Sequence, residues 1–488
     1  MKLTIVRMTI ELCSPLHIGS GLASPDTDAP VIRDAFGDYR IPGSSIAGAL
    51  RAFTDSTDPV PVWGEARERE NAASSIEVSD GFLVDWDGKS ALQKRLRGEP
   101  VRLSVFPEVQ DHVCIDHESG TAVEGGKFDS EIVPQGIRFR IELAFADRGG
   151  LGVGRPTFDS AVAALACGQV ALGGDVASGL GLVHIVAGSG SIAVFDLSDA
   201  KGLEAACRRS SDIDLPASDS HSAWTASTPS APSIGQDNHG TLTGTVKIRF
   251  RTDGPILVGG SQRPSTNSSA TADLVFGEVL VADYAAKRLV ARPLIPGSSL
   301  RGAIRGRVRV ILDALANKDS EGEIGCLFGS IAPGVGGEDA PRASKVRIGG
   351  AVLEPQPRTL VQHVAIDRLT GGSLRGALYS EAPIWQDGLS FIVTIQLDRV
   401  ELRHAAALAH AVIDMGTGDL PIGGGTRRGN GRLLFHSPSE APSDWHSAVS
   451  YSLSWSGQTV TEKCGADERR KLWNALDGAW GELVGGGK

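Results

Sequence analysis

The 488-residue sequence lacks three features that would assign it to common protein classes. It has no apolar run long enough to cross a membrane. Because "MKLTIVRMTIEL" alternates like a strand, we expect no signal peptide. Its six cysteines form no CxxC pair, which argues against a zinc site and fits a reducing cytoplasm. Its formal charge of −10 counts against a protein coated with nucleic acid. We therefore expect a cytoplasmic protein without a membrane partner. Net charge still permits a local basic groove, because arginine far outnumbers lysine.

One unusual phrase occurs twice. The stretch "IPGSSIAGALR" covers residues 41–51, and "IPGSSLRGAIRGRVR" covers residues 295–309. In both, Pro-Gly ends a strand, and the serines can cap the apolar, helically spaced run that follows. Each copy alone is compatible with an ordinary capped helix. Because a helix N-terminus also suits phosphate, we predict contacts with phosphate through Ser44, Ser45, Arg51, Ser298, Ser299, Arg301 and Arg305.

Four further stretches repeat in the same order at a nearly constant offset. The segment "CSPLHIGSG" matches "DGPILVGGS", and "ASSIEVSD" matches "ASKVRIGG". The segment beginning "HVCIDHESG" matches the one beginning "HVAIDRLTGG". Near the end of each copy, "LGGDVASGLGLV" matches "IGGGTRRGNGRL", which aligns Gly173 and Gly174 with Gly423 and Gly424. The chain is therefore predicted to be a tandem duplication.

The composition divides the duplicated chain into segments. Residues 208–240 are rich in Ser, Pro, Ala and Asp and are predicted to be a flexible linker. We therefore predict domains at residues 1–207 and 241–457, followed by a helical tail at residues 458–488 that packs on the second domain or on a neighbouring protein. Strands interleaved with two helices in each copy predict an α+β, ferredoxin-like fold with large insertions.

The ordered set of motifs resembles a known family. "PLHIGSG", "PVIRD…YRIPGSSIAGALR", "IDRLTG…YSE" and "GGGTRRGNGRL" are similar to motifs of the RAMP superfamily, in particular the backbone subunits of type III CRISPR effector complexes. Two such domains in one chain resemble the fused subunits of type III-D-like systems. The resemblance implies RRM-like domains that bind a guide RNA (crRNA) beside other CRISPR-associated subunits, with β-hairpin thumbs between guide and target RNA. In target-cleaving members, one aspartate per subunit cuts the paired target RNA.

The resemblance also assigns candidate catalytic residues. Asp28, just before Ala29 and Pro30, lies at the position of the family's cleaving aspartate, and Asp273 in "ADLVF" is its best counterpart. Asp283 aligns better with Asp34. Each carboxylate could hold Mg²⁺ or Mn²⁺ on a phosphate oxygen, or help to deprotonate the adjacent 2′-OH. The alternative is that Asp28 is a solvated loop aspartate.

Other polar residues are candidates for RNA contact. Arg427 and Arg428 are expected to contact guide phosphates, whereas Ala177 and Ser178 occupy that loop in the first copy. Gly173, Gly174, Gly423 and Gly424 are expected to bring backbone N–H groups close to phosphate. His17 is a further RNA-binding candidate, although Leu257 replaces it in the second copy.

Several motif residues also have structural interpretations. Asp116 and Asp367 are expected to cap turns at the base of the thumbs, rather than to pair catalytically with Glu131 and Glu381. His112 and His363 are expected to be structural or to contact RNA.

Three function classes therefore remain. The chain could be a target-cleaving backbone subunit, the same subunit acting only as a scaffold, or a guide-processing endoribonuclease. The last class is disfavoured because such enzymes usually use a histidine, and no histidine pair recurs in both copies.

Overall fold

The computed structural model describes most of the chain. It covers residues 1–22, 24–25, 27–54, 62–66, 71–105, 108–116, 119, 121–147, 154–208, 240–259, 272–316, 320–330, 342–386, 388–436, 448–455, 458–461 and 466–485. Residues 209–239 of the predicted linker lie outside the described residues. We call residues 1–208 the first half and residues 240–485 the second half. In the described part, no helix is long and apolar enough to span a membrane.

The first half is built around an antiparallel sheet whose central strand is β1, Lys2–Leu12. Alternate residues of β1 are apolar, and it pairs along nearly its whole length with β9, Arg138–Asp147. The helices α1 (Gly43–Thr54) and α3 (Arg155–Ala166) bury their apolar side chains in the core of this half. The other sheet strands are β2 (Arg40–Ile41), β5 (Ile76–Val78), β6 (Gly81–Leu83), β10 (Val183–Ile185) and β11 (Ser191–Asp196).

The second half repeats this arrangement. Its central strand β12, Thr241–Thr252, pairs antiparallel with β20, Ser390–Glu401, as β1 pairs with β9. The helices α6 (Gly297–Ala316) and α8 (Leu402–Thr417) correspond to α1 and α3. The remaining elements of this sheet and its cover are α7 (Glu321–Phe328), β16 (Val346–Ile348), β21 (Leu433–Phe435), β22 (Val449–Trp455), β23 (Gln458–Thr461) and α9 (Ala466–Gly485). The chain is thus a mixed α/β protein with two cores, one in each half.

Both halves extend beyond the last repeated motif. In the first half, β11 pairs with β1 and is followed by α4, Ala200–Arg208. In the second, β22 pairs with β12 and β23, and α9 packs on α8 through His410 and Trp480, whose ring centroids lie 3.6 Å apart. The segment predicted as a helical tail, residues 458–488, therefore includes an edge strand of the second sheet as well as α9.

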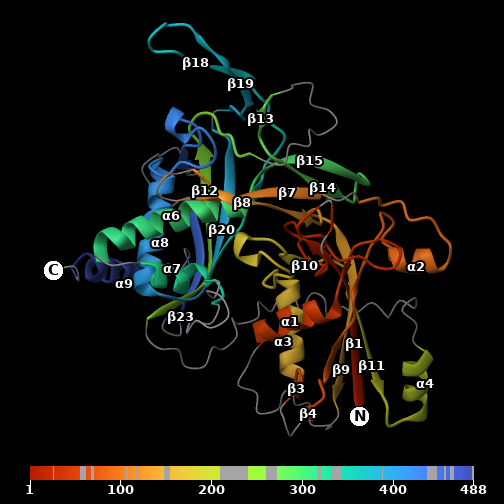
Figure 1. Ribbon diagram of the computed structural model, residues 1–488. Coiled ribbons are helices and arrows are strands. Elements are labelled where there is room, and N and C mark those ends of the chain that lie inside the picture. The colour runs from red at the N-terminus through yellow and green to blue at the C-terminus, as the bar shows by residue number, and fades with distance from the viewer. Residues whose placement is uncertain are drawn as a thin grey trace.

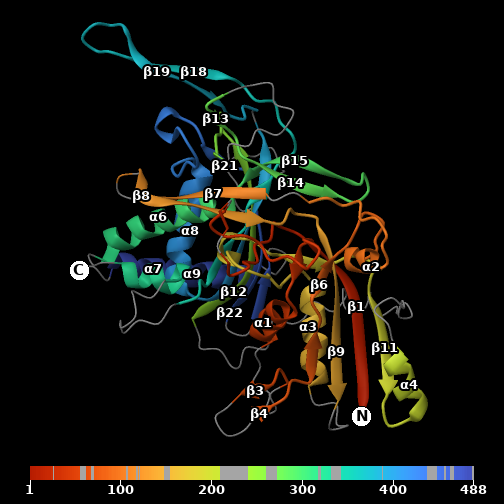
Figure 2. The same ribbon diagram turned by 45° about the vertical axis from the view of Figure 1, so that its right-hand side comes forward.

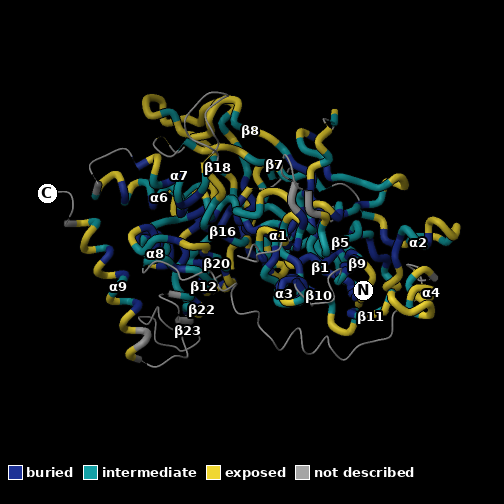
Figure 3. Tube along the Cα trace, turned by 90° about the horizontal axis from the view of Figure 1, so that it is seen from below, coloured by how far each residue is buried: buried dark blue, intermediate teal, exposed yellow. Residues whose placement is uncertain are grey.

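A long β-hairpin rises from each half. In the first half, β7 (Glu108–Ile115) pairs with β8 (Ala122–Ile132); in the second, β18 (Val361–Ile366) pairs with β19 (Ser373–Ala382). The first hairpin extends across the second half, whereas the second projects away from the body of the molecule (Figures 1 and 2). Both are largely exposed, and Figure 3 contrasts them with the buried strands and helices. Leu369, at the tip of the second hairpin, is 97% exposed.

Short elements complete the two halves. In the first half they are β3 (Glu65–Ala66), β4 (Asn71–Ala72), α2 (Ala91–Leu96) and the 3₁₀ turn η1 (Val176–Ser178). In the second half they are β13 (Leu274–Val275), β14 (Glu278–Asp283), β15 (Arg288–Ile295), β17 (Ala351–Val352) and the 3₁₀ turn η2 (Thr426–Arg428). The strands β14 and β15 form a hairpin that lies beside the first half (Figure 2).

The two halves contact each other through backbone atoms and side chains around β14. The N–H of Ala282 in β14 donates to the carbonyl of Gln135 at 2.8 Å, and Val281 forms a parallel bridge with Gln135. Nearby, the Leu280 N–H donates to the Glu108 carboxylate at 3.0 Å. A small apolar cluster of Ile132, Val279 and Leu294 is buried beside this contact. The β14–β15 hairpin therefore belongs to the second half but packs against the first.

A second inter-half contact requires glycine. The turn η1 approaches β16 so closely that a Cβ on Gly179 would lie 2.4 Å from the Cα of Gly349. Gly179 also has a φ of 82°, which L-residues with a side chain rarely adopt. A Cβ on Gly297 at the start of α6 would lie 2.0 Å from the carbonyl oxygen of Ser178. The glycines of the repeated motifs thus allow the two backbones to meet.

We predict that Gly179→Ala lowers the melting temperature more than Gly429→Ala. Both glycines have positive φ, so each alanine costs about 1–3 kcal/mol of backbone strain. Gly429 is the matched control because a Cβ there would have nothing within 4 Å, whereas a Cβ on Gly179 would also collide with the residue that follows β16. Differential scanning calorimetry of the two variants measures the difference. Equal melting temperatures would show that the η1 contact does not require glycine.

We also predict a pH-dependent effect of Glu108. Burial raises the pKa of Glu108 from 4.5 to about 8, although the Leu280 N–H opposes this shift. The folded protein therefore holds a proton that the unfolded chain releases between these values, so stability falls as pH rises from about 4.5 to about 8. Glu108→Gln removes this dependence while keeping an acceptor for Leu280. Its melting temperature should rise relative to the wild type between pH 5 and pH 8. The exposed Glu124→Gln is the control, and parallel curves for wild type and Glu108→Gln would contradict the prediction.

Candidate functional site

Asp28 lies where an extended loop meets the first hairpin. Its carboxylate accepts the backbone N–H of Asp129 at 3.1 Å, and its own N–H donates to the Asp129 carboxylate at 2.8 Å. The Thr27 hydroxyl donates to the same Asp129 oxygen at 2.7 Å and, with the Asp28 N–H, lowers the pKa of Asp129. Asp28 itself is exposed. The contact thus fixes the Asp28 backbone and leaves its side chain facing solvent.

Asp273 makes the same kind of contact with the second hairpin. Its carboxylate accepts the Ser380 N–H at 2.7 Å and the Ser380 hydroxyl at 2.9 Å, and its N–H donates to that hydroxyl at 3.1 Å. The backbone N–H and the hydroxyl of Ser380 lower the pKa of Asp273. Asp273 is also exposed. Each aspartate is therefore held reciprocally by one residue of a hairpin.

The hairpin register shows that the two positions correspond. In the first hairpin His112 lies opposite Phe128, and in the second His363 lies opposite Tyr379. Asp129 and Ser380 are the residues that follow these aromatics. Asp273 is therefore the geometric counterpart of Asp28. Asp283 instead closes the β14–β15 turn, where its carboxylate accepts the Ala286 N–H at 2.9 Å.

Each hairpin also carries a stacked His–aromatic pair, which sequence reasoning did not predict. The His112 and Phe128 rings lie 4.8 Å apart, and those of His363 and Tyr379 lie 4.9 Å apart. The equal spacing from histidine to aromatic in the two copies was the available signal. Burial lowers the pKa of His112, so it is neutral near pH 7. Because side chains alternate along a strand, these pairs face away from Asp129 and Ser380.

Glu131 and Glu381 follow in sequence but are not counterparts. Glu381 occupies the register position of Ser130, and each contacts the stacked histidine of its own hairpin: Ser130 to His112 at 2.9 Å, and Glu381 to His363 at 3.1 Å. Glu131 instead accepts the Val31 N–H and the Tyr39 hydroxyl, both at 2.8 Å, and pairs with Arg33. Buried Glu131 thus anchors the segment that follows Asp28.

Two of the four glycines that we expect to approach phosphate, Gly174 and Gly424, have N–H groups bonded within the protein. The Gly174 N–H donates to the His17 carbonyl at 2.7 Å, and the Gly424 N–H donates to the Leu257 carbonyl at 2.7 Å. Neither group is therefore free for phosphate. Gly173 and Gly423 are needed because a Cβ at either would lie within 2.3 Å of the same carbonyl oxygens. The His17 ring binds the Glu131 carbonyl through Nδ1 at 2.8 Å.

The two predicted phosphate-binding helix starts are not equivalent. At α1 the Gly43 N–H donates to the Asp80 carboxylate at 2.7 Å, so an anionic side chain already occupies this helix end. Ser44 is exposed, and the Ser45 N–H donates to the Pro42 carbonyl at 2.9 Å. Gly350 replaces Asp80 in the second copy. The start of α6 therefore lacks this carboxylate.

A cavity of about 780 Å³ lies between the halves at the start of α6. Its lining includes Ser298, His112, Phe128, Asp175, Gln110 and Arg249. It thus joins the His–aromatic pair of the first hairpin to the start of α6 in the second half, with the Asp175 carboxylate also in its lining. This is the described surface where a phosphate and a base could be held together.

The arginines of α6 are partly committed to contacts within the protein. Arg301 donates to the Phe328 carbonyl, and burial together with nearby Arg305 lowers its pKa. Arg305 lies 3.6 Å from a Glu321 carboxylate oxygen. Both remain half-buried, whereas Arg51 at the end of α1 is exposed. Ser299 is half-buried in the first turn of α6. Among these side chains, Arg51 is therefore the most accessible to a phosphate. The contact of each with phosphate stays a prediction.

The neighbouring arginines of η2 have different surroundings. Arg428 pairs with buried Glu381 and donates to the Tyr379 hydroxyl. The Arg427 side chain is exposed and reaches the Ser119 carbonyl in the turn of the first hairpin, at 3.5 Å. Arg427 is therefore the better placed of the two to contact RNA, whereas Arg428 neutralises a buried carboxylate.

The carboxylates of the first half are better suited to a divalent cation than those of the second. Asp28 and Asp129 bring two carboxylates to one exposed contact, and oxygen ligands suit Mg²⁺. Ser380 replaces Asp129 beside Asp273. Among the described residues, no group of three or more His, Cys, Asp or Glu side chains is arranged to hold a metal ion. Other ligands would have to come from water or substrate.

We predict that Arg428→Ala destabilises the protein, whereas Arg427→Ala does not. Loss of Arg428 removes an ion-pair partner from the buried Glu381 carboxylate. We expect the free energy of unfolding to fall by about 1 kcal/mol, because the half-exposure of Arg428 limits the strength of this ion pair. Arg427→Ala should change stability by about 0.5 kcal/mol at most. Urea unfolding of both variants provides the measurement. A destabilised Arg427→Ala with an unaffected Arg428→Ala would reverse the assignment.

Comparison with known proteins identifies the repeated unit. A family model described as the RAMP superfamily matches residues 9–184 and again residues 249–434. The chain is also 31% identical over 160 residues to a Methanocaldococcus jannaschii protein described as CRISPR system Cms endoribonuclease Csm3. That similarity covers 29% of this chain and 62% of the relative, so the chain spans less than two thirds of the relative's length.

The family matches contain both hairpins, both Gly-rich loops and both aspartate contacts. The chain, with one matched region in each half, belongs to the RAMP superfamily.

Proposed function

We propose that this protein is a crRNA-binding backbone subunit of a type III CRISPR complex, and that it cleaves guide-paired target RNA at two centres, Asp28 and Asp273. The observation that carries the proposal is the reciprocal contact of each aspartate with the same position of its hairpin. Similarity to a relative described as an endoribonuclease supports the assignment of RNA cleavage.

The exposed carboxylates suit cleavage in which RNA supplies the nucleophile. Asp28 and Asp273 are fixed through their own backbone, so each can accept a proton from a 2′-OH positioned beside it. The 2′-oxygen would attack the adjacent phosphorus, and the bond from phosphorus to the 5′-oxygen of the next nucleotide would break. The upstream product would then carry a 2′,3′-cyclic phosphate, and the 5′-oxygen would leave as a hydroxyl after taking up a proton. A bound Mg²⁺ or Mn²⁺ would supply positive charge near the reacting phosphate.

We infer that the two hairpins act as thumbs on ferredoxin-like RAMP domains. Their exposed apolar side chains, such as Ile115 and Leu369, suit insertion between nucleotides, and the His–aromatic pairs suit stacking. Ser298 and Arg427 are the best placed phosphate contacts of the second half. Guide RNA, target RNA and other CRISPR-associated subunits would be the partners, in the cytoplasm.

A scaffold role without cleavage is the second candidate for the second half. Ser380 stands where the first half has Asp129, so Asp273 has no neighbouring carboxylate at its hairpin contact. If two carboxylates are needed for the cation, the second half would bind RNA without cutting it. Guide processing by histidine has less support, because His17 is replaced by Leu257.

We predict that Asp28→Asn removes one product band from guide-paired target RNA and that Asp273→Asn removes another. Asparagine keeps an acceptor for the hairpin N–H but cannot accept a proton, so guide and target binding should change by less than about twofold. Sequencing gels of end-labelled target with the reconstituted complex provide the measurement. EDTA should abolish all bands, and a 2′-deoxy substitution at one scissile position should protect that position alone.

Asp477→Asn is the control, because exposed Asp477 lies in α9 and not in either hairpin or in the contact between the halves. It should leave every band unchanged. An unchanged pattern in Asp28→Asn would contradict the assignment of the first centre. Loss of the first band alone would support the scaffold role of the second half.

A further inference from the structure

We propose that Tyr284 is a positioning residue that locks the two halves together and so fixes the spacing between the Asp28 and Asp273 centres. This inference rests on the proposed function. Tyr284 follows β14 in the turn of the β14–β15 hairpin and so belongs to the second half. The partners of its hydroxyl and of its ring lie in the first half.

Tyr284 is held through both its hydroxyl and its ring. The hydroxyl donates to the Val84 carbonyl at 2.7 Å and accepts the Arg138 N–H at 3.2 Å. The Arg138 guanidinium lies over the ring, 4.2 Å from its centroid, and the Trp86 ring meets it edge-on at 4.9 Å. Burial raises the pKa of the Tyr284 hydroxyl above its ordinary value, so it remains a donor. These contacts fix both the position and the orientation of the hairpin turn.

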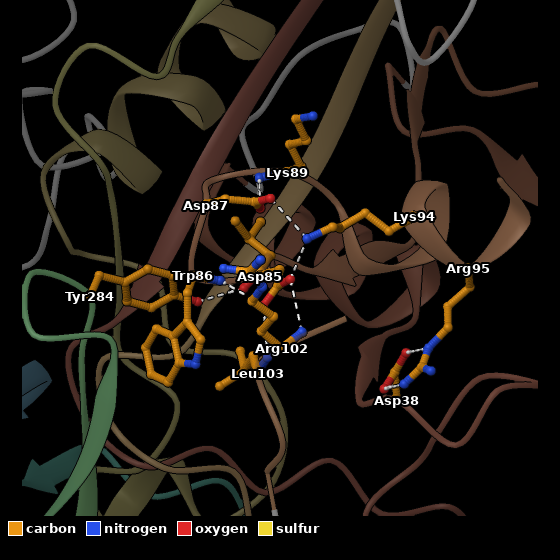
Figure 4. Close-up of polar contacts among 11 residues, drawn as sticks. Asp38, Asp85, Trp86, Asp87, Lys89, Lys94, Arg95, Arg102, Leu103 and Tyr284 are labelled. Atoms are coloured by element: carbon orange, nitrogen blue, oxygen red, sulfur yellow. Dashed lines mark hydrogen bonds and ion pairs between the residues drawn. The ribbon is translucent and has the colours of Figure 1, made fainter. Parts of the chain in front are cut away.

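The receiving surface in the first half is itself held rigidly. Buried Asp85 accepts the N–H groups of Leu103 at 2.7 Å and of Arg102 at 3.0 Å, and it pairs with Lys94 (Figure 4). Lys94 also pairs with Asp87 at 2.8 Å. Burial would raise the pKa of Asp85, but Lys94 and the backbone donors lower it below its usual value. This cluster flanks Trp86 and fixes the backbone that receives Tyr284.

A short path of contacts connects Tyr284 with the first centre. Asp28 is bound to Asp129 in β8, and three residues further along this strand Ile132 pairs with Glu108. The Glu108 carboxylate accepts the N–H of Leu280, which lies four residues before Tyr284 in the chain. The first centre is therefore connected to β14 through the base of its own hairpin.

The same strand leads to the second centre. Phe276 lies four residues before Leu280, and its N–H donates to the Ala382 carbonyl in β19 at 3.4 Å. Just before Phe276, β13 pairs with the same end of β19. Asp273 directly precedes β13 and binds Ser380 in β19. The two centres are thus connected through β8, β14, β13 and β19 and the hydrogen bonds between them. Tyr284, at the end of β14, holds this connecting strand against the first half.

This lock is present in one copy of the repeat. In the first half, the corresponding turn after Asp34 is short, and Phe36 in that turn is 47% exposed. The longer β14–β15 hairpin is therefore an insertion that gives the second half a side chain to place in the first. A target RNA bound along both halves would then meet two cleaving groups at one fixed separation.

The experiment compares Tyr284→Ala with two matched variants in the full chain. Tyr284→Phe keeps the ring contacts with Trp86 and Arg138 but loses the hydroxyl. Phe36→Ala removes the exposed aromatic of the equivalent turn. Dyes on non-canonical amino acids at exposed Val194 in β11 and Val310 in α6 report the distance between halves by single-molecule energy transfer. Cleavage sites on end-labelled target RNA are mapped with the reconstituted complex.

Tyr284→Ala should broaden the distance distribution. It should also slow one cut relative to the other by about tenfold or spread it over adjacent nucleotides, because a misplacement of about 1 Å can cost about a hundredfold in rate. Tyr284→Phe should largely restore both readouts, and Phe36→Ala should match the wild type. An unchanged distance distribution in Tyr284→Ala would overturn the lock. Absence of cleavage by the wild type would count against the proposed function alone, since the distance measurement does not depend on it.

Discussion

The backbone contact between β14 and residues 134–138 is the constraint on which the arrangement of this protein depends. It places a strand of the second half beside the first half, with the Ala282 N–H bonded to the Gln135 carbonyl. The base of the first hairpin joins this contact through Glu108, and a small apolar cluster is buried beside it. The two RAMP units are therefore linked by packed strands as well as by chain connectivity.

Each half uses the same local device to present an aspartate. In the first half Asp28, before β2, exchanges hydrogen bonds with Asp129 of the hairpin. In the second half Asp273, before β13, does the same with Ser380. These bonds fix the backbone of each aspartate while its carboxylate remains exposed. Burial is confined to neighbouring groups such as Glu131 and Glu381, which organise the surrounding segments. Each aspartate carboxylate therefore stays exposed to solvent while its backbone is held by the hairpin.

Duplication has been followed by divergence at several matched positions. The Asp80 carboxylate binds the start of α1, whereas Gly350 stands at the matching position beside the start of α6 and the inter-half cavity. Asp129 is matched by Ser380, and Ser178 by Arg428. The two halves therefore offer different electrostatic surroundings to the same kind of ligand. We infer that the first half is better equipped for cation-assisted chemistry and the second for holding phosphate.

The repeated motifs in the sequence were sufficient to predict the duplication, the RAMP family and a mixed α/β fold, because glycine, proline and serine at fixed spacings impose the same turns and helix starts in both copies. The resemblance to the family also offered Asp28 and its counterpart Asp273 as candidates. Only the tertiary structure shows that Asp273, and not Asp283, contacts the hairpin position that corresponds to the contact of Asp28, since this depends on the hairpin register. It likewise decided that the N–H groups of Gly174 and Gly424 are bonded internally and that Tyr284 reaches the other half. Those outcomes depend on contacts between residues far apart in the chain, which local sequence pattern does not encode.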